Sequence, residues 1–115
     1  MFGPDALAEA PIAAVVGTQV VAGTVDRLCV GSDTVRVVDF KTGRRVPDTV
    51  EDIPVYHLRQ MAAYAAALRV IFPDHAVEAA LLYTAGPRLF VLPGELLDAH
   101  KPGLGAGEQS LPRTA

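Results

Sequence analysis

Cysteine is almost absent from this sequence, since Cys29 is the single one among 115 residues. An internal disulfide framework is therefore excluded, and a reducing compartment, the cytoplasm, is the expected location. Cys29 itself is interpreted as an ordinary strand residue. No apolar run approaches the roughly 20 residues of a membrane span, and the first residues lack a charged segment followed by an apolar one. We therefore expect neither a secreted nor a membrane-embedded protein.

An excess of basic charge is also missing, because the formal net charge is -3. Such a chain has no global field that attracts nucleic acid, so any grip on it must be local or come from a larger assembly. The hydrophobic share of 50% and the charged share of 20% are typical of a compact domain with a real core. We expect one domain over residues 1–100, followed by a flexible tail over 101–115, which is rich in glycine and polar residues.

Strand-type segments alternate with turn signals along most of the chain. Residues 12–30 are rich in Val and Thr and are broken at Gly17-Thr18, which predicts a hairpin. The turn Gly31-Ser32-Asp33 precedes a third strand over 34–41. A further strand pair is predicted over 77–84 and 88–92.

Two helices are predicted. Residues 55–72 contain neither Gly nor Pro, and their apolar side chains recur at helical spacing; Asp52 is the expected N-cap, and Pro73 ends the segment. Many small alanines predict close packing on a sheet, and a short helix is expected over 94–100. Together the segments predict an α/β (α+β) fold with a mixed sheet of about five strands, one long packed helix and a short C-terminal helix.

The candidate chemistry lies on the second and third strands. Strand alternation places Asp39 and Lys41 on one face. A hairpin turning about Ser32 and Asp33 sets Asp26 opposite Asp39 or one position off. Two carboxylates this close repel each other unless a proton or a cation compensates, and oxygen ligands without a His/Cys cluster favour Mg²⁺ or Mn²⁺ over zinc.

Such a cation, with Lys41 orienting water or stabilising charge on phosphoryl oxygens, suits phosphodiester hydrolysis. The alternative is that Asp26 ends a strand and that Asp39 and Lys41 form a surface ion pair. Spacing alone favours this alternative, because acid-x-Lys on a strand is common.

The neighbouring residues point to a family. The segments Gly23-Thr24-Val25-Asp26-Arg27-Leu28 and Val37-Val38-Asp39-Phe40-Lys41-Thr42-Gly43, followed by Gln60 and Tyr64, resemble the RecB-like branch of the PD-(D/E)xK nucleases in order and interval. Within that branch these sequence motifs most resemble the C-terminal nuclease domain of AddA, a helicase-nuclease subunit of double-strand break repair. The resemblance covers about residues 8–98 and implies a restriction-endonuclease-like core.

The resemblance implies roles for matching residues only. Asp26 and Asp39 correspond to Mg²⁺ ligands, the Phe40 carbonyl to a further ligand, and Lys41 to the catalytic lysine. Gln60 and Tyr64 match the helical Gln and Tyr of the family, and their i, i+4 spacing places both on one helix face. The alternative is that Tyr64 belongs to the core and Gln60 to the helix surface.

Other polar residues have weaker assignments. Members of this branch carry a metal-binding His on a helix before the first strand, and nothing ahead of Glu9 matches it, so we expect a piece that lacks this helix. Glu9 is either a group behind the metal ligands or an exposed strand-end residue. Arg44 and Arg45 either contact phosphate or lie in an exposed loop. His57 is expected to face solvent, and neither His75 nor His100 is assigned to metal.

The expected function is that of a Mg²⁺-dependent DNA exonuclease domain in an ATP-dependent helicase-nuclease of double-strand break repair and recombination. Its expected partners are single-stranded DNA ends fed by the attached helicase motor and an AddB-type subunit. A bare sheet edge also makes self-association plausible. The alternative from another class is a nuclease-fold module that guides DNA or docks a subunit without cutting. A free-standing resolvase or CRISPR-associated exonuclease shares the chemistry and is disfavoured by the missing His.

Overall fold

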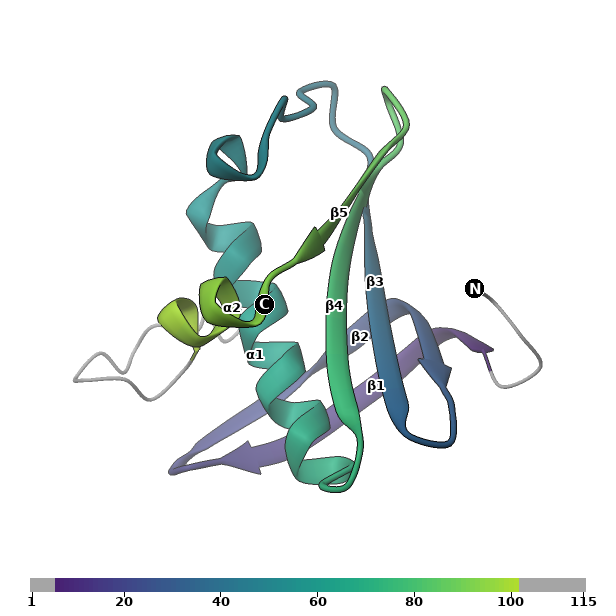
Figure 1. Ribbon diagram of the computed structural model, residues 1–115, viewed down its shortest axis with the longest axis vertical. Helices are drawn as coiled ribbons and strands as arrows, with labels where there is room; N and C mark the ends of the chain where they lie inside the picture. The colour runs from purple at the N-terminus through teal and green to yellow at the C-terminus, as the bar shows by residue number, and fades with distance from the viewer. Residues whose placement is uncertain (1–5, 102–115) are drawn as a thin grey trace.

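Five strands form one mixed sheet in the computed structural model, which describes residues 6–101 (Figure 1). In sheet order they are β1 (Ala6–Val16), β2 (Gln19–Val30), β3 (Thr34–Lys41), β4 (Ala76–Tyr83) and β5 (Arg88–Leu92). The predicted mixed sheet is confirmed, and so are the hairpin turn at Gly17-Thr18 and the bounds of β3. The first strand is longer than expected, because it begins at Ala6 rather than Ile12. The predicted tail beyond Lys101 lies outside the described residues.

All neighbouring strands are antiparallel except β3 and β4, which are parallel. Parallel neighbours need a long crossover, and here it contains the 3-10 turn η1 (Val50–Asp52) and the long helix α1 (Val55–Ile71). The second helix, α2 (Gly94–His100), lies on the same face of the sheet as α1 (Figure 1). No helix within residues 6–101 has the length and apolarity that crossing a membrane requires.

The expected helix cap at Asp52 is wrong. The α1 helix begins after Pro54, which is its N-cap residue and makes no side-chain capping bond. Asp52 instead belongs to η1, and its Oδ2 accepts a hydrogen bond of 3.2 Å from the Thr49 hydroxyl. Asp52 therefore ends η1, and Ile53 and Pro54 separate it from the start of α1.

The helix α1 presents mainly small side chains to the sheet. Nine of its residues are buried: Leu58, Met61, Ala62, Ala63, Tyr64, Ala65, Ala66, Ala67 and Leu68. Alanine side chains let a helix axis approach close to the strands beneath it, so polar side chains on β3 come within reach of the helix. The close packing predicted from the alanines is confirmed.

The hairpin β1–β2 reverses its pleat near Asp26. Val25 and Leu28 both face the core although they are three residues apart, whereas regular alternation repeats every two. On β1 the change occurs at Glu9, which has a φ of 55° and lies between the pairs Ala8↔Arg27 and Ala10↔Val25. The reversal therefore occurs in both strands at the same level, where Asp26 leaves the ladder and approaches β3.

We predict that Ala67→Leu destabilises the protein by about 1–3 kcal/mol, because Ala67 is fully buried and the larger side chain overpacks the helix–sheet interface. Urea unfolding measures the change. The matched control is Val70→Leu on the same helix, where the side chain is about half exposed and the change should stay within about 0.5 kcal/mol. Equal stability of both variants would contradict close packing of α1.

Candidate active site

The Lys41 ammonium joins the sheet to the helix. Its Nζ lies 2.7 Å from Asp39 Oδ2 and donates a hydrogen bond of 2.8 Å to Gln60 Oε1. Lys41 is the last residue of β3, and Gln60 lies in the second turn of α1. An ammonium group has three N–H donors, so two fix its position and one is left for a substrate or water.

Asp39 carries a charge into the protein interior. Its side chain is buried, with 7% of the residue exposed, and no other charged residue within residues 6–101 is buried to this degree. Burial raises the pKa of its carboxyl; Lys41 opposes this shift, and the nearby Asp26 carboxyl adds to it. The ionised form therefore costs folding free energy, and a further cation beside the two carboxylates would relieve that cost.

Asp26 of β2 is held in place by a main-chain group of the neighbouring strand β3. Its Oδ2 accepts a hydrogen bond of 2.7 Å from the backbone N–H of Phe40. The antiparallel pairing of β2 with β3 ends at Arg27↔Val38, one step before Asp26 and Asp39 would pair. The register predicted for these two carboxylates is therefore confirmed, although a side-chain hydrogen bond replaces the next rung of the ladder.

The donor set at this end of β3 suits a hard divalent cation. Asp26 and Asp39 supply carboxylate oxygens, and no group of three or more His, Cys, Asp or Glu residues capable of holding a metal occurs within residues 6–101. Mg²⁺ is commonly held by one or two carboxylates, with water and substrate phosphates completing its shell. Two carboxylates whose proximity raises the Asp39 pKa fit that pattern.

Tyr64 approaches the same centre from the next turn of α1. Burial raises the pKa of Tyr64, and the negative charge of Asp39 adds to the shift, so the phenol stays protonated and able to donate. Its hydroxyl lies directly over Gly23 of β2, where an added Cβ would lie 2.6 Å from the oxygen. Gly23 is therefore the residue that admits the Tyr64 ring, a role that the sequence motif contains but does not reveal.

Glu9 lies inside β1 and not at a strand end. It is exposed, and the register places it opposite Asp26. A φ of 55° is unusual for glutamate and costs of order 1–3 kcal/mol, and such strain clusters near functional sites. Glu9 thus marks the pleat reversal behind Asp26.

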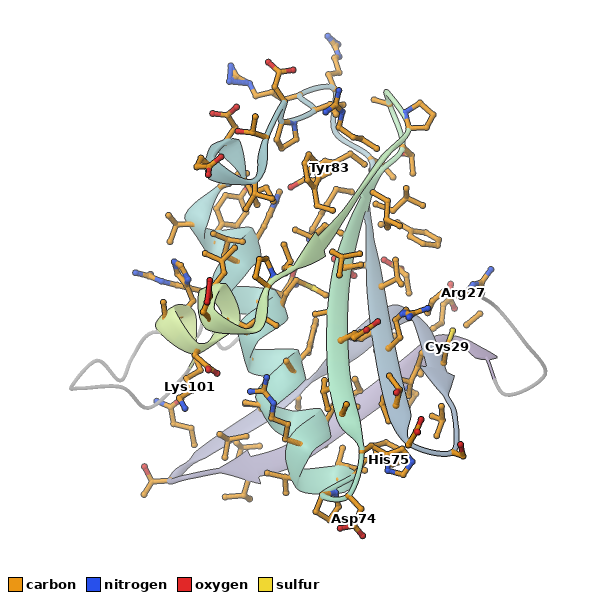
Figure 2. The ribbon with its side chains drawn as sticks, viewed as in Figure 1. Arg27, Cys29, Asp74, His75, Tyr83 and Lys101 are labelled. Atoms are coloured by element: carbon orange, nitrogen blue, oxygen red, sulfur yellow. The ribbon has the colours of Figure 1, made fainter. Side chains whose placement is uncertain are left out.

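His57 does not face solvent, contrary to expectation. Its Nδ1 shares a hydrogen bond of 3.0 Å with the hydroxyl of Tyr83, which lies between α1 and the strands in Figure 2. Burial lowers the pKa of His57 to about 4, and the positive charge of Lys41 acts in the same direction. The i, i+3 spacing from Gln60 was a usable sequence signal, since such residues share a helix face.

The other polar residues singled out in the sequence lie away from this centre. Arg44 and Arg45 are exposed in the loop after β3, and no contact joins either to the centre within the described part of the chain. His75 shares a hydrogen bond with the Gly31 carbonyl, and His100 with the Leu96 carbonyl. Cys29 is a β2 residue, as expected.

The mixed five-stranded sheet, with two carboxylates and a lysine gathered beneath one helix, defines the restriction-endonuclease-like class of folds. The family comparison agrees: a profile described as "PD-(D/E)XK nuclease superfamily" matches residues 3–104. The chain belongs to this superfamily, whose members generally are metal-dependent nucleases.

Two further comparisons are less informative. A solved structure titled "Crystal structure of SSO0001" is similar, with 16% identity and a TM-score of 0.49 over 81% of this chain. The aligned part spans 47% of that structure's chain, so this chain covers about half of its length. No curated protein matches the sequence.

We predict that Gly23→Ala destabilises the protein by about 1–3 kcal/mol, because the new methyl group overlaps the Tyr64 ring. Urea unfolding measures the loss. Adding Tyr64→Phe removes the closest atom and should recover part of the stability, which a double-mutant cycle quantifies. Gly43→Ala is the matched control, since nothing lies within 4 Å of its added Cβ. Additive effects of the two changes would contradict the contact.

We predict that wild-type protein loses stability relative to His57→Gln as the pH falls from about 6.5 to 4. The folded-state pKa is about 4, below the ordinary value of 6.5, so unfolding takes up a proton in this window. The stabilisation is complete above pH 6.5 and disappears as the pH falls through 4. Thermal unfolding of both proteins from pH 3 to 8 measures the difference; parallel curves would show that His57 titrates normally.

Proposed function

We propose that this chain is the nuclease domain of a helicase-nuclease and hydrolyses DNA phosphodiester bonds with Mg²⁺, or with Mn²⁺ in its place. The observation that carries the proposal is the Lys41 ammonium held between Asp39 and Gln60, beside the second carboxylate of Asp26. A surface ion pair does not explain this arrangement, because Asp39 is buried and its ionisation is opposed by burial.

In this proposal Asp26 and Asp39 would hold the cation, and the Phe40 carbonyl would be a further ligand. When bound, the cation lowers the pKa of water and polarises the phosphodiester. Lys41 uses its remaining N–H to orient the attacking water or to stabilise charge on a phosphoryl oxygen. Gln60 fixes the direction of the ammonium, and Tyr64 supplies a protonated hydroxyl nearby.

The assembly is also part of the proposal. The sequence motifs around Asp26, around Asp39 and at Gln60 and Tyr64 resemble those of AddA most. This resemblance favours exonucleolytic cutting in double-strand break repair and recombination. A chain with a net charge of -3 and exposed Arg44 and Arg45 has little basic surface of its own. A motor and an AddB-type subunit would supply the main grip and deliver single-stranded ends.

We predict that Lys41→Ala lowers cleavage of labelled single-stranded DNA in Mg²⁺ by roughly 10²–10³-fold, since a charge-stabilising donor is lost. Gln60→Ala should cost roughly 10–100-fold, because it releases the lysine from its position. Asp39→Asn should abolish cleavage. Product ladders from 5′-labelled and 3′-labelled strands measure both rate and polarity.

Stability separates the catalytic effect of Asp39 from a folding defect. The raised pKa of Asp39 means that its ionised form destabilises the fold at neutral pH, so Asp39→Asn should unfold at a higher temperature at pH 7. The advantage should shrink as the pH falls through the raised folded-state pKa of Asp39 and be gone below its ordinary value of 3.8. Mg²⁺ should stabilise the wild type and not this variant.

Two outcomes would contradict the proposal. Cleavage unaffected by Lys41→Ala or Asp39→Asn would show that the activity lies elsewhere. Absence of cleavage, with no saturable Mn²⁺ binding that is lost in Asp26→Asn by titration calorimetry, would favour the non-cleaving guidance or docking module.

A further inference from the structure

Tyr56 is an aromatic side chain exposed beside the candidate active site. It lies in the first turn of α1 and is 70% exposed, more than any other aromatic ring in residues 6–101. The other large exposed hydrophobic residues are aliphatic: Val15, Val20, Val55, Val70, Ile71, Leu89 and Val91. An exposed aromatic ring needs a reason that an exposed valine does not, because its desolvation by a flat partner yields more free energy.

The Tyr56 ring packs on a half-buried histidine, which is held in turn by a buried tyrosine. It packs edge-on against His57, with ring centroids 4.4 Å apart and an interplanar angle of 66°. His57 is held by the hydroxyl of Tyr83, whose ring is buried and contacts Phe90 at 5.9 Å between centroids. Figure 2 shows Tyr83 between α1 and the strands. The contacts from Tyr56 through His57 to Tyr83 therefore restrain the otherwise exposed Tyr56 ring. This restraint lowers the conformational entropy that the side chain loses when a ligand stacks on it.

Tyr56 continues the helix stripe that forms the centre. Tyr56, Gln60 and Tyr64 follow one another at i, i+4 spacing, so they lie along one face of α1. Gln60 holds Lys41, and Tyr64 lies near Asp39. Tyr56 thus lies four residues, or about 6 Å along the helix axis, from the residue that positions the lysine.

Charges of both signs lie near Tyr56, because the exposed Arg59 is three residues further along α1 and two carboxylates precede the helix. Glu51 and Asp52 are exposed just before α1 and repel phosphates. Arg44 and Arg45 lie in the exposed loop that follows Lys41, so phosphates are better placed on that side. A neutral aromatic ring stacks on any base, because every base has a π face.

We propose that Tyr56 is a stacking platform for one unpaired base of the DNA strand whose phosphodiester lies at Asp39 and Lys41. This inference rests on the proposed function and adds a contact that selects single-stranded DNA, because a base inside a duplex is already stacked on its neighbours.

A fluorescence titration tests the stacking directly. The chain contains no tryptophan, so Tyr56→Trp introduces a single reporter, and Val20→Trp places one at the equally exposed tip of the β1–β2 hairpin. A thymidylate oligomer and a base-free deoxyribose-phosphate oligomer of equal length are titrated without Mg²⁺, which prevents cleavage. Quenching is expected for Tyr56→Trp with the thymidylate oligomer alone, and in neither titration of Val20→Trp.

Affinity measurements give the energetic part of the test. By fluorescence anisotropy of the labelled thymidylate oligomer, Tyr56→Ala should bind roughly 5- to 100-fold more weakly than wild type, the range expected for loss of one base–aromatic stack. Tyr56→Phe should bind within about twofold, since it keeps the ring. Neither substitution should change binding of the base-free oligomer or of a blunt duplex.

Each outcome decides the matter. Equal affinity of wild type and Tyr56→Ala for the thymidylate oligomer would overturn the stacking site and leave the nuclease proposal in place. Equal loss with base-free and base-bearing oligomers would overturn it as well, since the contact would then be with the backbone. No binding of any oligomer by the wild type would overturn the stacking site, and the nuclease proposal is then decided separately by the cleavage assay in Mg²⁺.

Discussion

The arrangement of the candidate active site depends on one polar contact across the helix–sheet interface, the Lys41 ammonium between Asp39 Oδ2 at 2.7 Å and Gln60 Oε1 at 2.8 Å. Asp39 is too buried to carry its charge without this cation, and burial still raises its pKa. The lysine in turn is fixed in direction because its two partners come from different elements. A strand residue and a helix residue thereby hold one reactive group.

This contact requires α1 to lie close to the sheet, and small residues on both sides make that possible. Buried alanines line the inner face of α1, and Gly23 leaves room on β2 for the Tyr64 ring. The parallel pair β3–β4 fixes where the helix starts and ends, since α1 is the crossover between them. Packing and chemistry are therefore constrained by the same side chains.

At Glu9 and Asp26 the regular strand geometry is interrupted, and the interruption turns Asp26 toward the candidate active site. Regular alternation after Val25 would keep Asp26 on the face opposite the core, whereas Leu28 faces the core and Asp26 bonds to the Phe40 N–H. The strained φ of Glu9 is the cost of this change. A fold selected for stability alone has no evident use for a strained glutamate opposite Asp26, or for a carboxylate at Asp26 that opposes ionisation of Asp39.

Alternation and helical spacing determined much from the sequence alone: strands over 34–41 and 88–92, the short helix over 94–100, the facing of Asp39 with Lys41, and the register that brings Asp26 to them. These are short-range patterns with fixed periods. The tertiary structure alone decided that the partner of His57 is the Tyr83 hydroxyl, that Gly23 admits Tyr64, and that Glu9 is a strained residue within a strand. Each of these depends on contact between segments far apart in the chain, and no local period encodes such contacts.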